Sequence, residues 1–66
     1  MNILITGGTG LIGSAFIRQF DQHQYTVLTR SPAQAKTRLP AYVQLIDSLE
    51  RLDSLDDFDA VINLAG

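Results

Sequence analysis

The 66-residue sequence has no cysteine and a single histidine, His23. Without cysteine the chain can form neither a disulfide nor a thiolate metal site, and one histidine is too few for a structural zinc site. No stretch approaches the roughly 20 consecutive apolar residues of a membrane-spanning helix. The first residues carry no basic segment and enter an apolar run directly. We therefore expect a cytoplasmic protein with no signal peptide and no membrane partner.

Charged residues are also few, and their distribution is uneven. The net charge is −2, from five Lys and Arg against seven Asp and Glu. Residues 1–43 hold four of the basic residues and one acidic residue, whereas residues 44–66 hold one basic and six acidic residues. The basic residues of 1–43 are too few for a nucleic-acid surface, although their positive charge would suit an anionic cofactor. We interpret the acidic half as a solvated face.

The most informative stretch is residues 2–13, Asn-Ile-Leu-Ile-Thr-Gly-Gly-Thr-Gly-Leu-Ile-Gly. An apolar run leads into Gly7, Gly10 and Gly13, and a helical pattern of apolar residues follows. A strand, a glycine turn and a helix in this order are how α/β proteins hold the pyrophosphate of a dinucleotide. Without a Cβ, backbone N–H groups can approach the phosphate oxygens, and the helix presents its positive dipole end. A glycine turn that binds nothing is the alternative interpretation.

Strands and helices alternate along the rest of the chain. We predict strands over 2–6, 25–29, 42–46 and 60–64, helices over 11–20 and 32–39, and a weak helical turn over 49–55. The apolar spacing places five residues near one face of the first helix: Leu11, Ile12, Ala15, Phe16 and Phe20. Ser31 and Pro32 mark the start of the second helix, and Asp47 and Glu50 have the spacing of a capping box.

This alternation predicts an α/β fold, the N-terminal part of a doubly wound Rossmann fold with parallel sheet order 3-2-1-4. Two right-handed crossovers place the first two helices on one face of the sheet, which leaves the other face a single weak helix. Parallel strands need cover on both faces, and the fourth strand is an open edge. A 66-residue chain also buries only about 60% of its unfolded surface. We therefore expect residues 1–66 to be the first part of a longer protein, or to be completed by self-association.

Three motifs together resemble the short-chain dehydrogenase/reductase superfamily: Thr6 to Gly13, Leu28-Thr29-Arg30, and Val61-Ile62-Asn63-Leu64-Ala65-Gly66. Within it, the chain looks most like the extended, nucleoside-diphosphate-sugar epimerase-like branch. The resemblance implies that the pyrophosphate is lined by Gly7, Gly10, Leu11, Ile12 and Gly13. It places Arg30 at the adenosine ribose and Asp47 and Ser48 near the adenine. It also places Leu64, Ala65 and Gly66 at the border of the cofactor.

The resemblance implies no catalytic residue in this chain. The family's Ser/Thr and Tyr-x-x-x-Lys pair come after the fourth strand, and Tyr25 and Tyr42 have no lysine four residues on. Some members of the branch also depart from this pattern. The Gly-His that often precedes the second strand of the family is Gln22-His23 here, and we expect His23 to be a loop residue.

Arg30 bears on the choice of cofactor. An NAD site of this kind ends its second strand with a carboxylate that accepts from the ribose hydroxyls, but here the positions are Thr29 and Arg30. A guanidinium can bind a 2′-phosphate in a bidentate manner, so we predict NADP over NAD. An arginine in a solvated loop is the alternative.

Asp47 either accepts a hydrogen bond from the adenine amino group or caps the turn that follows it.

The leading interpretation is therefore the NADP(H)-binding portion of an epimerase or reductase that acts on a sugar-nucleotide-like or other small carbonyl substrate. The part of the protein that binds the substrate would follow residue 66. Asn63 either satisfies backbone groups near the cofactor or faces a neighbouring loop. The alternatives for the whole are a non-catalytic nucleotide-binding regulator and an inactive fragment.

Overall fold

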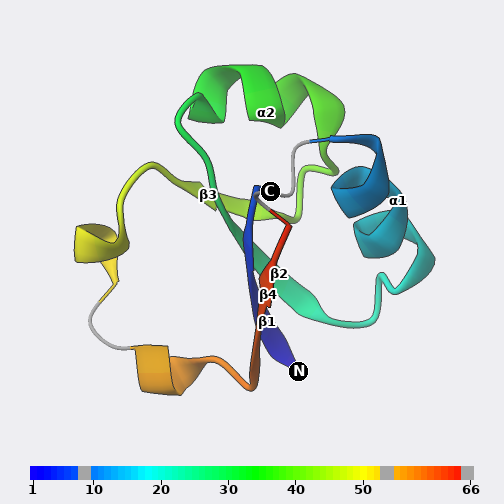
Figure 1. The fold of residues 1–66 in the computed structure, drawn as a ribbon. Helices are drawn as coiled ribbons and strands as arrows, with labels where there is room; N and C mark the ends of the chain where they lie inside the picture. The colour runs from blue at the N-terminus through cyan, green and yellow to red at the C-terminus, as the bar shows by residue number, and fades with distance from the viewer. Residues whose placement is uncertain (8–9, 53–54, 65–66) are drawn as a thin grey trace.

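The computed structural model describes residues 1–7, 10–52 and 55–64. In these residues a parallel sheet has the strand order β3-β2-β1-β4, as predicted (Figure 1). The elements are β1 Asn2–Thr6, α1 Leu11–Gln19, β2 Gln24–Leu28, α2 Pro32–Arg38, β3 Gln44–Ile46, the 3₁₀ helices η1 Leu49–Arg51 and η2 Leu55–Asp57, and β4 Ala60–Asn63. The α/β class and the incomplete doubly wound topology are confirmed.

Strand β1 is the centre of the sheet. Its residues pair with β2 on one side, from Asn2 opposite Gln24 onward, and with β4 on the other. Ile3, Leu4 and Ile5 are at most 4% exposed, which is typical of a parallel strand covered on both faces. The apolar run that opens the sequence therefore supplies the most buried strand.

The main core lies between the sheet and the two helices, which cover one face together (Figure 1). The strands contribute Ile3, Ile5, Tyr25 and Val27, and the helices and the loop after α2 contribute Ile17, Ala35, Leu39 and Val43. Each of these buried side chains contributes about 1.5–3 kcal/mol relative to an exposed position, apart from the smaller alanine.

The buried face of α1 differs from the prediction. Gly13 and Ile17 are buried against the sheet and Phe16 is partly buried, whereas Ile12 is 77% exposed and Ala15 and Phe20 are also exposed. Gly13 and Ile17 lie one turn apart on the same stripe of α1, and Ile17 belongs to the main core. The side chain of Leu11 lies outside the described residues. Apolar spacing alone could not distinguish these two stripes of α1.

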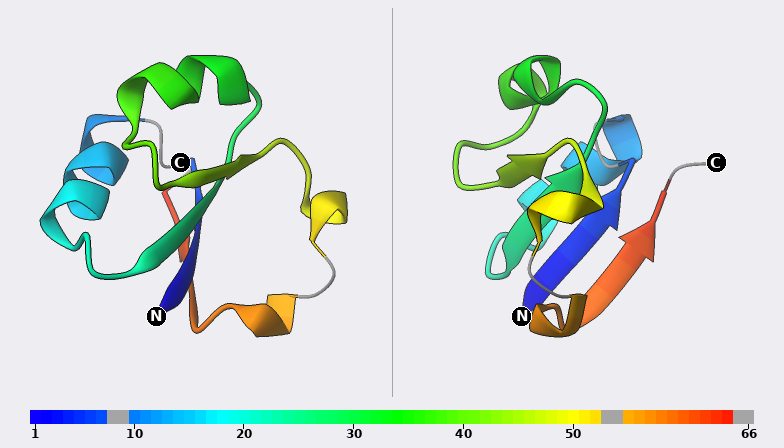
Figure 2. Two further views of the ribbon diagram at one scale, coloured as in Figure 1. Left: turned by 180° about the vertical axis from the view of Figure 1, so that it is seen from behind. Right: turned by 90° about the vertical axis from the view of Figure 1, so that its left-hand side faces the viewer.

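The opposite face has thin cover. The predicted weak helical turn over 49–55 is confirmed in part, because the chain forms the 3₁₀ helix η1 at Leu49–Arg51 and a second one, η2, at Leu55–Asp57. Leu52 and Phe58 from this segment lie over Thr26 and Gln44, around a cavity of about 370 Å³. Val61, which pairs with the buried Leu4, is 56% exposed. Figure 2 shows β4 as the outer strand beside β1, so this face is open at the β4 edge.

Some element ends differ from the predicted ones by a few residues. Strand β3 begins at Gln44 and not at residue 42, because the Val43 N–H donates to the Pro40 carbonyl at 3.1 Å and closes a turn first. Pro32 occupies the first turn of α2 and Ser31 its N-cap, as predicted, although no side-chain hydrogen bond caps this end.

Two structural features are absent from the described residues. None of the helices in the described ranges has the length and apolar character needed to cross a bilayer. The same residues contain no group of three or more His, Asp or Glu side chains arranged to hold a metal ion.

The open β4 edge generates a prediction about association. In dilute solution, residues 1–66 alone are expected to self-associate or to bind a hydrophobic dye, because Val61 lies exposed on an unpaired edge strand. Val61→Lys should reduce association, whereas Tyr42→Lys, an exposed position away from β4, should not. Size-exclusion chromatography with light scattering is the measurement. A monodisperse wild-type monomer with a sharp, cooperative thermal transition would contradict the prediction.

Candidate functional site

The carboxyl ends of the strands meet at one edge of the sheet, and two cavities lie there. The strand-end cavity, of about 540 Å³, is lined by Gly7, Leu28, Thr29, Arg30, Asp47, Ser48 and Leu49. The glycine-turn cavity, of about 410 Å³, is lined by Gly7, Gly10, Ile12, Gly13 and Leu64. Since Gly7 lines both, the two cavities adjoin at the end of β1.

Gly7 turns the chain away from β1. Its φ of 75° is in the left-handed region, which side chains other than glycine rarely adopt. Its N–H donates to the Leu28 carbonyl at 3.3 Å and so ties the turn to the end of β2. The backbone of Gly7 is therefore fixed between the two cavities.

Gly10 differs from Gly7 in both its backbone conformation and the space around it. Its backbone is extended (φ −80°, ψ −177°), and a Cβ placed on it would meet no described atom within 4 Å. The packing of the chain itself would accept a side chain here, so the glycine keeps space open in the cavity. Gly10 is also the N-cap of α1, where the Ser14 N–H donates to its carbonyl at 3.0 Å.

The N-terminal end of α1 faces this space. Its N-cap, Gly10, provides no side-chain cap, and the first turn of the helix contains no acidic residue. The first N–H groups of a helix lack intrahelical partners and, with the helix dipole, attract an anion. Ile12 and Leu64 add apolar walls. The glycine-turn cavity thus combines a positive backbone with apolar sides.

The end of β2 places Thr29 and Arg30 in the strand-end cavity. The Thr29 N–H donates to the Ile46 carbonyl at 2.9 Å, and the Thr29 hydroxyl accepts from the Ser31 N–H at 3.2 Å. Arg30 is exposed, and its guanidinium makes no ion pair with the residues that the structure describes. The Arg30 guanidinium, unpaired among the described residues, favours an anion at this end of the cavity, and Asp47, the carboxylate in the same lining, follows β3.

The end of β3 brings in Asp47 and Ser48 but corrects the predicted cap. Asp47 Oδ1 accepts from Arg51 Nε at 2.7 Å, and both side chains are about half exposed or more. Ser48, not Asp47, is the N-cap of η1, and its hydroxyl accepts from the Glu50 N–H at 3.2 Å. The capping box of Asp47 and Glu50 is wrong because the serine directly before the turn occupies that position.

A side-chain contact joins the carboxyl ends of β1 and β4. Thr6 Oγ1 donates to Asn63 Oδ1 at 2.8 Å, and the Leu64 N–H donates to the Thr6 carbonyl at the same distance. Asn63 therefore bonds a side chain of the neighbouring strand, a contact that neither of its two sequence interpretations included. The contact places Leu64 in the glycine-turn cavity.

The structure brings together most of the residues that the sequence singled out: Gly7, Gly10, Ile12, Gly13, Arg30, Asp47, Ser48 and Leu64. Ala65, Gly66 and the side chain of Leu11 lie outside the described residues. His23 is a loop residue, as predicted, and its Nδ1 is 3.2 Å from the amino group of Met1. The sequence missed Leu49 in the strand-end cavity, and it assigned no site role to Arg38.

Arg38 lines a third, smaller space that we call the arginine cavity. It measures about 140 Å³ and is lined by Thr29, Arg30, Ser31, Gln34, Ala35 and Arg38. The sequence feature that could have indicated this cavity is the spacing of Ser31, Gln34 and Arg38, which lie along one stripe of the helix that follows Arg30. Thr29 and Arg30 line this cavity and the strand-end cavity alike.

Comparisons with known proteins agree with this geometry. Residues 3–66 match the model of the NAD dependent epimerase/dehydratase family. The chain is 41% identical over 68 residues to Protein Rcp of Vibrio cholerae and 37% identical over 65 residues to an epimerase family protein of Staphylococcus haemolyticus. These matches cover 97% and 96% of the chain but only 33% and 21% of the two relatives, so the chain spans a third of their length or less.

A solved structure gives the same result. The chain superposes on a crystal structure of a protein from Lactobacillus casei with a TM-score of 0.78 and 30% sequence identity. The superposition covers 97% of the chain and 32% of that protein. The fold of the 66 residues is thus that of one part of a larger relative.

The two glycines generate a stability prediction. Gly7→Ala should lower the free energy of unfolding by about 1–2 kcal/mol, because alanine must adopt the left-handed conformation. Gly10→Ala should change the free energy of unfolding by less than about 0.5 kcal/mol. Alanine is a poorer N-cap than glycine, but it also makes the unfolded chain less flexible, and the two effects offset each other. Urea unfolding followed by circular dichroism measures both. Equal losses in the two variants would contradict the roles assigned to these glycines.

Proposed function

Because the chain belongs to the NAD dependent epimerase/dehydratase family, we propose that residues 1–66 are the N-terminal part of a NAD(P)-binding Rossmann domain that holds the adenosine and pyrophosphate of NADP(H). Family membership itself implies a nicotinamide dinucleotide. The observation that supports the proposal most is that two cavities adjoin at Gly7, where residues from positions 7 to 64 gather at the carboxyl ends of the strands. Open α/β sheets bind their ligands at this edge.

The pyrophosphate occupies the glycine-turn cavity in this proposal. Gly10 leaves room for phosphate oxygens to approach the backbone, and the first N–H groups of α1, at Leu11, Ile12 and Gly13, donate to them. Leu64, followed by Ala65 and Gly66, borders the cofactor from the end of β4.

The adenosine occupies the strand-end cavity. Arg30 binds the 2′-phosphate of the ribose, and this contact favours NADP over NAD because the β2 end offers no carboxylate to a free 2′-hydroxyl. Asp47 and Ser48 lie against the adenine. Asp47 Oδ1 is held by Arg51, so its second carboxylate oxygen can accept from the adenine amino group.

The chain's own contribution to a reaction is to bind and orient the cofactor. When bound, a nicotinamide dinucleotide supplies hydride transfer to or from a carbon that bears oxygen, here in a sugar-nucleotide-like or other small carbonyl substrate. The acid/base group and the substrate pocket belong to residues beyond this chain, which contains no Tyr-x-x-x-Lys. On this proposal the complete protein is a cytoplasmic epimerase or reductase. The alternative function is that of a non-catalytic nucleotide-binding module, which binds the cofactor at the same site.

The phosphate-binding role is tested at Gly10. In the complete protein, Gly10→Val should abolish binding of NADPH, because the branched side chain enters the space that the pyrophosphate needs, while the fold survives in the ordinary backbone conformation of this residue. Titration of NADPH fluorescence measures binding, and circular dichroism checks the fold. Equal affinities for the wild type and the valine variant would contradict the assignment.

The cofactor preference is tested at Arg30. The wild type should bind NADPH more tightly than NADH, and Arg30→Asp should erase or reverse this order, since a carboxylate repels the 2′-phosphate and accepts from a free hydroxyl. A charge-assisted contact of this kind contributes on the order of 1.5–3 kcal/mol, less where solvent screens it. Lys36→Asp, which alters a cation outside the cavity, is the control. Tighter binding of NADH to the wild type would show that Arg30 has another role.

A further inference from the structure

The arginine cavity holds a second guanidinium that the strand-end position of Arg30 does not account for. Arg38 lies at the end of α2, seven residues after the N-cap Ser31, and lines the cavity together with Ser31, Gln34 and Arg30. Helical side chains lean toward the N-terminus of their helix, which for Arg38 is the direction of Gln34 and the end of β2, and this agrees with its place in the lining of the cavity. Two arginines from different elements therefore line one small space.

The backbone of Arg38 is held in place. The Arg18 guanidinium donates to the Arg38 carbonyl at 3.0 Å, and the Leu39 N–H donates to the Ala35 carbonyl at 3.0 Å to close the last turn of α2. Helix α1 thus fixes the end of α2 through Arg18. The position of the Arg38 backbone does not depend on a ligand.

The chemistry of the cavity suits a phosphate monoester. No carboxylate is among its lining residues, and neither Arg30 nor Arg38 forms an ion pair with the described part of the chain. Ser31 and Gln34 add neutral hydrogen-bond donors. The volume of about 140 Å³ equals several water molecules at about 30 Å³ each, which is enough for a phosphate group. Paired guanidinium forks match the oxygens of such a group.

We propose that Arg38 is a specificity-determining residue that binds, together with Arg30, the phosphate monoester on the adenosine 2′-position. The inference rests on the proposed function, because the adenosine must lie in the strand-end cavity for its 2′-substituent to enter the arginine cavity. Thr29 and Arg30 line both spaces, so the two ligand groups would lie side by side. A 3′-phosphate or a free hydroxyl would not place a dianion between the two arginines.

The test compares nucleotide fragments on the complete protein by calorimetry. The probes are 2′,5′-ADP, 3′,5′-ADP, 5′-AMP and inorganic phosphate. Arg38→Gln should lower the affinity for 2′,5′-ADP about three- to tenfold, as expected for the loss of one solvent-exposed charge contact. The same variant should leave the affinity for 5′-AMP unchanged. Arg38→Lys should lie between the wild type and the glutamine variant, because it keeps the charge and loses the fork.

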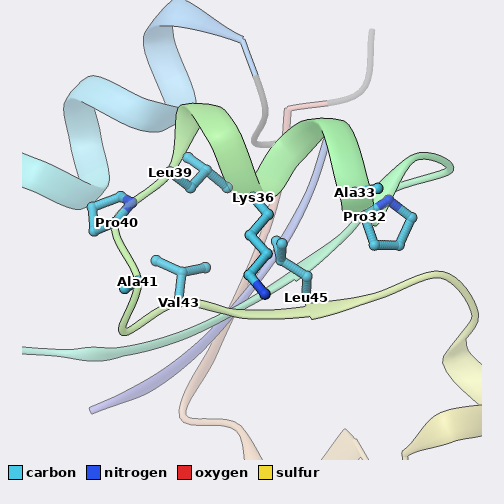
Figure 3. A pocket seen from close by; sticks show the side chains of 8 residues that line it. All are labelled: Pro32, Ala33, Lys36, Leu39, Pro40, Ala41, Val43 and Leu45. Atoms are coloured by element: carbon cyan, nitrogen blue, oxygen red, sulfur yellow. The ribbon is translucent and has the colours of Figure 1, made fainter.

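Lys36→Gln is the matched control. Lys36 and Arg38 are both basic residues of the last turn of α2, so the two variants remove equal charge from the same turn. Lys36, however, points into a separate apolar cavity of about 580 Å³ between α2 and β3, beside Leu39 and Leu45 (Figure 3). Lys36→Gln should change the affinity for 2′,5′-ADP by less than about twofold.

The outcomes separate this inference from the proposed function. If the wild type binds 2′,5′-ADP and the Arg38 and Lys36 variants both leave its affinity unchanged, the role of Arg38 is overturned while the NADP site stands. The role of Arg38 is also overturned if Arg38→Gln and Lys36→Gln weaken the binding of 2′,5′-ADP equally. It is overturned as well if Arg38→Gln weakens the binding of 2′,5′-ADP and of 3′,5′-ADP equally. Inorganic phosphate that binds as tightly as 2′,5′-ADP, with the same dependence on Arg38, would make the cavity a free phosphate site. A wild type that binds neither 2′,5′-ADP nor 5′-AMP overturns the proposed function itself.

Discussion

The site depends on the central position of β1 in a parallel sheet. β1 lies between β2 and β4, so the chain leaves β1 toward one side of the sheet and returns to the other side for β4. The turn after β1 leads to α1 and β2 while β4 lies on the other side of β1, and the strand-end and glycine-turn cavities form a crevice at this carboxyl end, a place that α/β proteins use for ligands. This arrangement requires β1 to be buried on both faces, as the apolar run from Ile3 to Ile5 allows. The turn at Gly7 can then leave the sheet directly at the crevice.

The three glycines at the same spacing differ in their structural surroundings. Gly7 has a backbone conformation that other residues adopt only with strain, Gly10 leaves space that the described residues do not fill, and Gly13 is buried within α1. Gly10 is also the N-cap of α1, a position where glycine is preferred to alanine. Its packing does not require glycine, because a Cβ there would meet no described atom within 4 Å.

The sequence was sufficient for the strand order, for the edge at which the site lies and for most of its residues, because each of these follows from local motifs and from the rules of parallel sheets. It was not sufficient where two local solutions compete. Ile12 and Ile17 belong to different apolar stripes of α1, and packing in the folded chain buries Ile17 and leaves Ile12 exposed. Asp47 and Ser48 are both good caps, and Ser48 takes that role while Asp47 pairs with Arg51. Arg38 shares the spacing of Ser31 and Gln34, but that spacing alone does not show that the three line a cavity with Arg30.

The positions of the basic residues leave positive charge beside the strand ends without an ion-pair partner in the part of the chain that the structure describes, although the chain is acidic overall. Arg51 is neutralised by Asp47, and Arg18 donates to a carbonyl at the end of α2. Arg30 and Arg38 have no such partner in the described residues, and both line one small polar cavity beside the strand ends. The net charge of −2 therefore does not describe the charge at this place, because Arg30 and Arg38 are the charged residues among those that line the arginine cavity.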